Sequence, residues 1–458
     1  MLHINIYAQN VGIGTTTPKA AFNVAPGKTV LFGNDTTGSG GKLMWIPSKY
    51  AFRAGAVGSV STQGFTFNED PHTWDADSIG AFSFAGGYSN KALGMGSTAF
   101  GLKNTVRNFA SVAIGEHNDL TKEFAYAMGR DNRILSNSSM AFGNSNMVNS
   151  VAGFAIGTDN EVYGDFSIVA IGSSNTCSEY NAMALGHFND ATNLYSTAIG
   201  ANHLVESVYG MSIGYNTINN SRNCTIVGAT NLSMPEWSPD VWRGTDPIFI
   251  VGNGYQQIRN NAMLIQKNGW VGINTNTPDG LLHLRFNSFS GIPQLMLEES
   301  SNDYSRITFR NTNPGYWDVA AFTQPFLGNN GSAHINFYFS QFGNVLSLKG
   351  NGNASLAGVL TQNSDMRLKK NIEPIADALT RVLKINGYTY NWNDTLRGSA
   401  LQIGFIAQEL EQQFPELVAT DDDGIKSVAY SNMIPVLLEA IKEQQKEIEE
   451  LKAMVKVK

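Results

Sequence analysis

The most regular pattern along the chain is a motif of a small residue, an apolar residue and a glycine that returns every fourteen residues. Examples are STAFGLKN, SVAIGEHN, SMAFGNSN and GFAIGTDN. The glycines are Gly87, Gly101, Gly115, Gly129, Gly143, Gly157, Gly172, Gly186, Gly200, Gly214 and Gly228, with one step of fifteen after Gly157. This period predicts a β-solenoid whose coils each contain two short strands and two turns. Because side chains alternate along a strand, the alanine and the isoleucine of VAIG are expected on opposite faces.

A column of asparagines accompanies the glycines. Three residues after most of them stands an asparagine, at Asn90, Asn104, Asn118, Asn132, Asn146, Asn160, Asn175, Asn189 and Asn231, whereas His203 and Thr217 interrupt the series. Glycine accepts a positive φ at a corner. Asparagine also tolerates left-handed backbone, and its amide can bond to the same residue in the next coil. We therefore expect left-handed corners and an amide ladder at the asparagines.

A coil this thin encloses few side chains, so its outward apolar residues are expected to need cover from another copy of the chain. These residues include Phe109, Phe124, Tyr163, Phe166 and Tyr209. The repeats at 84–231 resemble the left-handed β-roll head of YadA-type trimeric adhesins, whose coils have the same spacing of AIG and Asn. The resemblance implies a homotrimeric, surface-exposed rod that meets a host-surface receptor or glycan, and it does not identify that receptor.

Two segments outside the repeats match each other. NVGIGTTTPKAAFNV at 10–24 aligns without gaps with WVGINTNTPDGLLHL at 270–284, and both predict a strand, a tight turn and a strand. They are similar to segments of secreted bacterial and phage fibre proteins that mark entry into a new β module. The predicted division is an N-terminal β cap or attachment region at 1–79, the β-roll at 80–232, and a connector at 233–284.

Residues 285–363 alternate apolar and polar positions, as in SRITFRN and HINFYFS. The alternation predicts short antiparallel strands of a β-rich stalk or small β domain. Trp317, Tyr338 and Phe326 are candidates for a sugar-binding surface, with core or intersubunit packing as the alternative. The opening MLHINIYA is interpreted as the tail of a secretory signal, with an ordinary first strand as the alternative.

After Ser364 the apolar period changes from two to about 3.6. EPIADALTRVLKI predicts a helix with Pro374 in its first turn, GYTYNW a strand, IGFIAQELEQQFPELV a strand and a helix, and DDDGIKSVAY a hairpin-like turn. A coiled-coil seam follows, at Ile434, Leu437, Ile441, Gln444, Ile448, Leu451 and Val455. Residues 364–458, through SDMRLKKNI, IGFIAQELEQQFPELV and KSVAYSNMIPVLLEAIKEQ, resemble the intramolecular chaperone auto-processing domain of endosialidase-type tailspikes.

This second resemblance implies a domain that trimerises, guides folding of the preceding fibre and then cuts itself off. Carried onto this sequence, it places the nucleophile at Ser364, the base at Lys369 and the scissile bond at Asn363–Ser364. A serine hydroxyl needs a neighbouring base, and a lysine amine serves as one only when partly withdrawn from water. The alternative is that Ser364 caps a turn and Lys369 faces solvent.

Composition narrows the remaining function classes. The chain has 458 residues, of which 46 are Gly, 42% are hydrophobic and 15% are charged, and this mixture fits extended β architecture with many turns. A net charge of −7 without a basic stripe argues against a nucleic-acid partner, and the sequence has no run long enough for a membrane span. Cys177 and Cys224 are interpreted as small packing residues. No cofactor or metal site is expected, because His117, His187 and His203 lie in different registers of the repeat.

The predicted fold class is mainly β: a trimeric left-handed β-roll or solenoid fibre with a β-rich stalk and a small C-terminal α+β domain ending in a coiled coil. The predicted function is a homotrimeric extracellular fibre or adhesin of a cell surface or virion, with a secreted bacterial surface protein preferred. Its C-terminal domain would act as a trimerisation chaperone and as a single-turnover serine endopeptidase. The alternatives are a phage tail fibre receptor-binding protein that keeps the domain as an uncleaved cap, and a polysaccharide-degrading tailspike with paired carboxylates.

Overall fold

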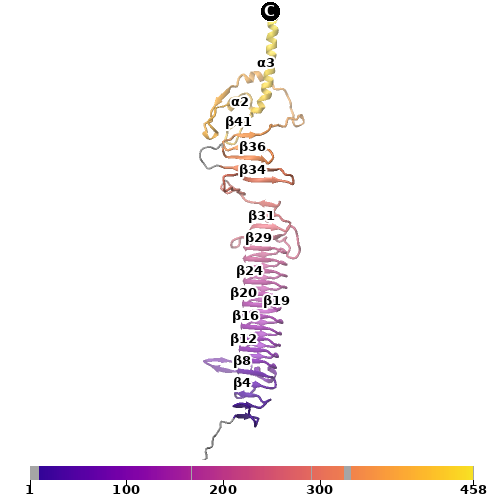
Figure 1. Cartoon of the computed structure of the whole chain (residues 1–458), viewed down its shortest axis with the longest axis vertical. Coiled ribbons are helices and arrows are strands. Elements are labelled where there is room, and N and C mark those ends of the chain that lie inside the picture. The colour runs from indigo at the N-terminus through magenta and orange to yellow at the C-terminus, as the bar shows by residue number, and fades with distance from the viewer. Residues whose placement is uncertain (1–9, 167, 290, 324–331, 457–458) are drawn as a thin grey trace, which may run out of the picture. The chain divides into compact units, whose positions relative to one another are not determined.

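The fourteen-residue repeat forms a parallel β-solenoid, the stack of short arrows in Figure 1. Each coil contributes one five-residue strand, at β8 (Phe84–Tyr88), β10 (Thr98–Leu102), β12 (Val112–Glu116), β14 (Tyr126–Arg130), β16 (Met140–Asn144), β18 (Phe154–Thr158), β20 (Val169–Ser173), β22 (Met183–His187), β24 (Thr197–Ala201), β26 (Met211–Tyr215) and β28 (Thr225–Ala229). A second strand follows in nearly every coil, at β9 (Lys91–Ala92), β11 (Thr105–Val106), β13 (Asp119–Leu120), β15 (Arg133–Ile134), β17 (Met147–Val151), β19 (Glu161–Phe166), β21 (Thr176–Cys177), β23 (Asp190–Ala191), β25 (Leu204–Val205) and β27 (Ile218–Asn219). The predicted mainly β fold is confirmed.

The computed structural model describes residues 10–166, 168–289, 291–323 and 332–456. The chain divides into two units, Met1–Gln294 and Leu295–Lys458. The predicted signal remnant at 1–8 and the aromatic candidate Phe326 lie outside the described residues.

Neighbouring coils stack in register, so each repeat position forms a column along the solenoid. Ala113 pairs with Ala127, and Ile114 pairs with Met128. The alanines are buried inside the coil, whereas Ile114 and Met128 are 36% and 51% exposed. The predicted alternation of faces is therefore confirmed. The outward side chains, hereafter the outer apolar column, are Phe100, Ile114, Met128, Phe142, Ile156, Ile171, Leu185, Ile199, Ile213 and Val227.

The glycine column is required by both backbone geometry and stacking. Gly129 has a φ of 119°, a conformation that L side chains rarely adopt. A Cβ atom at this position would overlap the carbonyl oxygen of Gly143 in the next coil. Glycine thus lets the chain turn and lets adjacent coils approach to hydrogen-bonding distance.

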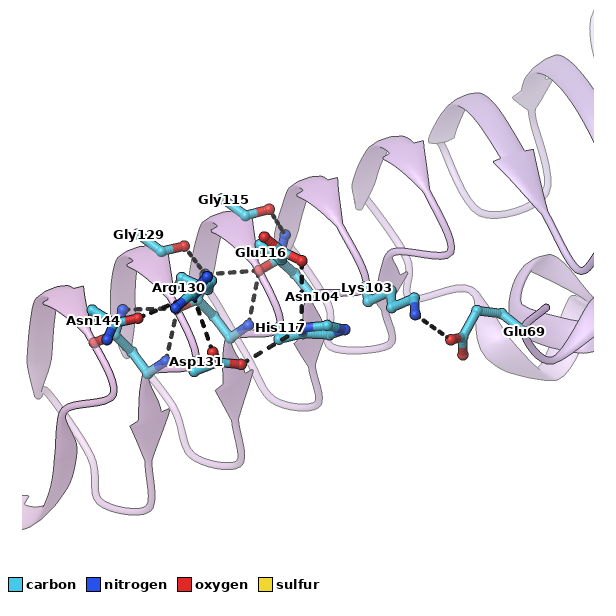
Figure 2. A network of polar contacts seen from close by, with 12 residues as sticks. Glu69, Lys103, Asn104, Gly115, Glu116, His117, Gly129, Arg130, Asp131 and Asn144 are labelled. Atoms are coloured by element: carbon cyan, nitrogen blue, oxygen red, sulfur yellow. Dashed lines mark hydrogen bonds and ion pairs between the residues drawn. The ribbon is translucent and has the colours of Figure 1, made fainter. Parts of the chain in front are cut away.

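The asparagines form the expected ladder inside the solenoid. Asn132 is fully buried, and its backbone N–H and Nδ2 donate to Oδ1 of Asn118 at 3.1 and 2.9 Å. Its Nδ2 also donates to the carbonyl oxygen of Gly143 at 2.9 Å. Figure 2 shows the equivalent bond from Asn104 to Gly115. Each rung therefore satisfies backbone groups of two coils as well as the neighbouring amide.

The left-handed backbone predicted for the asparagines belongs instead to the residue before each of them. Asp131, for example, has a φ of 54°. The exposed corner residue makes the turn, which leaves the asparagine free to direct its amide inward. Where the asparagine column stops, His203 Nδ1 and the Thr217 hydroxyl lie 2.7 Å apart and continue the ladder with different groups.

Replacing Asn132 with alanine is expected to destabilise the solenoid by about 3 kcal/mol or more, because buried partners in both adjacent coils lose their hydrogen bonds. The urea midpoint of the β-sheet circular dichroism signal measures the loss, with protein concentration held constant. Asn149→Ala is the matched control, since Asn149 is exposed on β17 and its replacement is expected to shift stability by less than about 0.5 kcal/mol. Equal shifts for the two variants would contradict a structural role for the ladder.

Strands outside the repeat extend the solenoid sheet at its N-terminal end. These are β3 (Val30–Phe32), β4 (Gly40–Ile46) and β5 (Ala51–Val57), beside the hairpin β6 (Val60–Thr62) and β7 (Phe65–Phe67) and the turns η1 (Pro71–Trp74) and η2 (Ala76–Ser78). Arg53 occupies the position of an inner alanine and is fully buried. Its guanidinium donates to the carbonyl oxygens of Phe52, Ser83 and Ala92, and burial lowers the pKa of Arg53 to about 10. The side chain thereby closes the end of the coil interior.

The two matching VGI segments adopt the same structure, but not the predicted one. In the first, β1 (Val11–Ile13) pairs in parallel with β2 (Phe22–Val24). In the second, β31 (Val271–Ile273) pairs in parallel with β32 (Leu282–Leu284) in the same register. A tight turn joins only antiparallel strands, so the predicted tight turn is wrong. The second motif joins the solenoid sheet through β29 (Pro247–Asn253) and β30 (Asn261–Gln266).

Both cysteines lie inside the solenoid, in agreement with their interpretation as packing residues. Cys177 and Cys224 are fully buried and unpaired. Burial raises the pKa of the Cys177 thiol to about 12 and also raises that of Cys224. These thiols are therefore poor nucleophiles.

The second unit begins with a five-stranded antiparallel sheet of sequential strands. The strands are β33 (Ser305–Arg310), β34 (Tyr316–Phe322), β35 (His334–Phe339), β36 (Gly343–Lys349) and β37 (Ala354–Leu356). One face of this sheet carries Ile307, Phe309, Trp317, Ile335, Phe337, Leu348 and Leu356, each between 37% and 59% exposed. We refer to it as the apolar sheet face. The opposite face is polar.

The remainder of the second unit is a small α+β arrangement. Its elements are η3 (Met366–Leu368), α1 (Ala378–Val382), β38 (Gly387–Tyr390), η4 (Thr395–Arg397), β39 (Gln402–Phe405), α2 (Ala407–Gln413), η5 (Pro415–Leu417), β40 (Val418–Thr420), β41 (Lys426–Val428), η6 (Tyr430–Asn432) and α3 (Met433–Lys456). The first helix is shorter than predicted and excludes Pro374. Asp377 has a φ of 54°, a left-handed conformation that prevents the helix from starting earlier.

Candidate self-processing site

Ser364 and Lys369 lie five residues apart and meet across a single short turn. The turn is η3, whose preceding residue Asp365 accepts a hydrogen bond from the backbone N–H of Arg367 at 2.8 Å. The backbone N–H of Lys369 then donates to the carbonyl oxygen of Met366 at 3.1 Å, which ends the turn. As a result, Lys369 Nζ lies 2.7 Å from Ser364 Oγ. The two predicted catalytic residues are therefore in hydrogen-bond contact.

The charged side chains of Asp365 and Arg367, next to this contact, form an ion pair with each other. The Arg367 guanidinium lies 2.7 Å from the Asp365 carboxylate. Its side-chain hydrogen bond, together with the backbone bond, lowers the pKa of Asp365, and the same pairing raises the pKa of Arg367. Lys369 is not a partner in this ion pair, and its amine is directed at the serine hydroxyl.

The whole stretch from 352 to 374 is exposed, including Asn363, Ser364 and Lys369. It also carries large apolar side chains, with Val359, Leu360, Met366, Leu368 and Ile372 each at least 62% exposed. A single chain thus leaves the amine exposed to water, whereas a lysine that acts as a base must be partly withdrawn from water. Exposed apolar side chains thus flank the dyad in the sequence on both sides.

A compact core anchors the segment that follows. Leu410, Phe414, Leu417, Met433 and Val436 are buried together, and α3 packs against α1. The Glu443 carboxylate on α3 accepts the backbone N–H groups of Ala378 and Leu379 at 3.0 and 2.7 Å. A negative charge at a helix N-terminus is favourable, so Glu443 fixes the start of α1.

The predicted heptad seam lies on α3 but is open to solvent. Ile434, Leu437, Ile441, Ile448, Leu451 and Val455 are between 38% and 75% exposed. Met433, Val436 and Ala440 are the buried residues of this helix, and they face the core. The helix therefore has two apolar faces, one of which has no cover within the described part of the chain.

The other predicted candidates do not come together in one common site. Trp317 pairs with Phe339 on the apolar sheet face, whereas Tyr338 pairs with Asp318 on the polar face, so the two aromatics point in opposite directions. On the solenoid, His117 lies 3.7 and 3.5 Å from the carboxylates of Glu116 and Asp131, at the surface (Figure 2). Among the residues described, no cluster of three His, Cys, Asp or Glu has a geometry that could hold a metal ion.

Comparison with known proteins identifies the C-terminal part. Residues 364–419 match the family model described as the chaperone of endosialidase. The match begins at Ser364. The chain is also 35% identical over 96 residues to the long tail fiber protein Gp37 of Enterobacteria phage K3, which covers 20% of this chain and 8% of that protein.

Two further relatives have the same name. Long tail fiber protein Gp37 of Enterobacteria phage Ox2 is 34% identical over 110 residues, or 22% of this chain and 43% of the relative. That of Salmonella phage S16 is 33% identical over 131 residues, or 26% and 18%. The aligned region thus spans less than half the length of these relatives. In the described part of the chain, no helix has the length and apolar character needed to cross a membrane.

Sequence reasoning missed two features of the site. The first is the Asp365 cap, for which the signal was an aspartate directly before a three-residue turn. The second is the carboxylate of Glu443, which reaches α1 from 64 residues away along the chain. Only the fold places these two segments together.

Proposed function

We propose that the protein is a homotrimeric phage tail fibre whose C-terminal domain assembles the trimer and then cuts the chain between Asn363 and Ser364. The observation that carries the self-processing part is the 2.7 Å contact between Ser364 Oγ and Lys369 Nζ at the first residue of the chaperone-family match. The names of the relatives support a fibre of the virion over the secreted bacterial surface protein that the sequence favoured.

The proposed reaction is an acyl shift followed by hydrolysis. Neutral Lys369 Nζ takes the hydroxyl proton of Ser364 as Oγ attacks the carbonyl carbon of Asn363. The peptide C–N bond breaks, the proton passes from lysine to the leaving Ser364 nitrogen, and an ester joins Asn363 to Oγ. This step already frees the amine of Ser364, and water then opens the ester to give a carboxylate at Asn363 and to restore the hydroxyl of Ser364. Burial of the lysine by neighbouring chains would make cleavage depend on assembly.

Three uncovered apolar surfaces support the trimer. They are the outer apolar column of the solenoid, the apolar sheet face and the heptad seam of α3. Continuous exposed apolar surface of this kind is rare in monomers and is normally covered by another chain. A parallel trimer would cover each surface with the same surface of two other copies.

The domain scheme belongs to the same proposal. It comprises an N-terminal attachment region at 1–79, a YadA-like head at 80–232, a connector at 233–284, a β-rich stalk at 285–363 and the chaperone domain at 364–458. The stacked repeats with an internal asparagine ladder support the resemblance to an adhesin head. A host-surface receptor or glycan would be the external partner.

Introducing Ile441→Glu into chains kept intact by Ser364→Ala is expected to prevent trimer formation. Ile441 is 62% exposed on the seam, and three carboxylates in one apolar layer would repel each other. Light scattering should show a species of about three times 49.7 kDa for the parent, and for the variant only monomer or aggregate without that species. Lys446→Glu places the same residue on an exposed position away from the seam and should leave the trimer intact. A parent chain that is monomeric would contradict the proposed function.

A further inference from the structure

The polar face of the five-stranded sheet contains a cradle that neither the self-processing reaction nor assembly uses. We propose that this cradle binds neutral hexopyranose units of a surface polysaccharide. The inference rests on the proposed function, because a trimer that covers the apolar sheet face leaves the polar face turned outward to meet a host.

The cradle is a cavity of about 350 Å³ over strands β33 to β36. Its walls include Tyr304, Tyr316 and Tyr338, and its floor includes Asp318 and Asn336. The floor residues are only 5% and 2% exposed, although they lie on the surface of a single sheet. The polar face is therefore hollow, and the aromatic side chains form a rim around two buried polar groups.

The register of the strands places these groups in two adjacent rows. Thr308 pairs with Asp318, which pairs with Tyr338. In the next row Ala320 pairs with Asn336. The small side chain of Ala320 leaves space above the sheet between the tyrosines. The space follows from the fold and does not require movement of a loop.

This combination of groups suits a sugar ring. A pyranose has C–H faces that pack on aromatic rings and hydroxyl edges that need donors and acceptors. A carboxylate accepts two hydroxyl groups, and an amide offers both a donor and an acceptor. Asn336 Oδ1 already accepts the Ser347 hydroxyl at 2.7 Å. Asp318 would therefore accept from one sugar hydroxyl and the Asn336 amide would donate to the next, while Tyr316 or Tyr338 covers a C–H face.

The local charges favour a neutral ligand over an acidic one. Arg306 lies 2.6 Å from Asp303 and 4.0 Å from Asp318, so its charge is already paired. Asp318 also accepts the Thr308 hydroxyl at 2.6 Å, with lone pairs left for a ligand. An acidic sugar would bring a second carboxylate close to Asp318, where Arg306 is already shared between two carboxylates.

The test uses the intact protein on an array of immobilised neutral oligosaccharides built from glucose, galactose, mannose and N-acetylhexosamines, with sialylated oligosaccharides alongside. Binding is expected to neutral sugars. Tyr338→Ala should weaken the apparent affinity at least tenfold, because it removes one aromatic wall. Asn344→Ala, at the exposed rim of the same cavity, is a second variant that avoids the sheet interior and should weaken binding threefold or more.

Tyr255→Ala is the matched control, since Tyr255 is 74% exposed and lies in the other unit. It should bind as the parent does. Equal binding by parent and cradle variants, binding only to sialylated sugars, or no binding to any sugar would each overturn the inference. The trimer mass and the cleavage of the same samples are measured in parallel, so that a failed fibre assignment is distinguished from a failed sugar site.

Discussion

Replacing Ser364 with alanine is expected to leave a chain that stays at its full length of 458 residues during prolonged incubation. The parent chain should lose residues 364–458, which are 95 of the 458 residues and about 10 kDa of the 49.7 kDa mass. Lys369→Ala should give the same result, with each rate reduced roughly a thousandfold or more. A denaturing gel measures both.

The expected size of the effect follows from the chemistry of the dyad. Ser364→Ala removes the nucleophile, and Lys369→Ala removes the base that lies 2.7 Å from the hydroxyl. Because the two groups act in one step, the double variant should be no slower than either single variant. Lys369→Arg should also fail, since a guanidinium keeps its proton at any working pH.

Lys370→Ala is the matched control for these variants. Lys370 is the next residue, is also exposed, and should be replaceable without loss of cleavage. Cleavage of Ser364→Ala at the same bond would show that the nucleophile is assigned wrongly. A parent trimer that remains uncut would favour the alternative in which the domain is a permanent cap.

The stacking of the solenoid could be predicted from the sequence because each coil requires similar residue types at the same positions. Glycine at one corner and asparagine three residues later meet the same packing in successive turns, so eleven glycines and nine asparagines make the pattern visible. The left-handed corner could not be placed, because its residues share no chemistry: Lys103, His117 and Asp131 all adopt it. Because side chains of different chemistry adopt this left-handed conformation, no residue type in the sequence marks its position.

The pairing of strands that are distant in the sequence is the second feature that could not be predicted. The alternation of Tyr304, Arg306 and Thr308 with Ile307 and Phe309 shows that the sheet has a polar and an apolar face. Which residues of neighbouring strands share a face depends on the register of the strands. In the structure Trp317 pairs with Phe339 and not with Tyr338, so Trp317 and Tyr338 lie on opposite faces.

The contact between Ser364 and Lys369 has a related explanation, whereas the roles given to the two residues rest on the resemblance alone. The pair Ser364 and Lys369 is local, so a turn of three residues suffices to bring the side chains together. The groups that would shield these two side chains from water are not close to them in the sequence. The apolar side chains of the exposed stretch indicate where other chains would pack, and the sequence of one chain cannot specify that geometry.

The last prediction concerns the order of folding and cleavage. A chain expressed from the start as residues 1–363 is expected to aggregate, with a yield of soluble trimer at least roughly tenfold below that of the full chain. The same residues released by cleavage after folding should remain soluble. The two samples have identical covalent structure, so only their folding history differs. Light scattering and sedimentation of both samples measure the difference.

The physical reason lies in the distance between paired groups. Within one chain the coils pair at a separation of fourteen residues, which is local and fast. Alignment of three chains is not local, and until it occurs the outer apolar column and the apolar sheet face are exposed. In the proposed trimer the seam of α3 would align the three chains first. The shortened chain lacks α3 and therefore lacks this alignment step. If the chain ending at Asn363 reaches the same trimer in equal yield, residues 364–458 do not act as a chaperone.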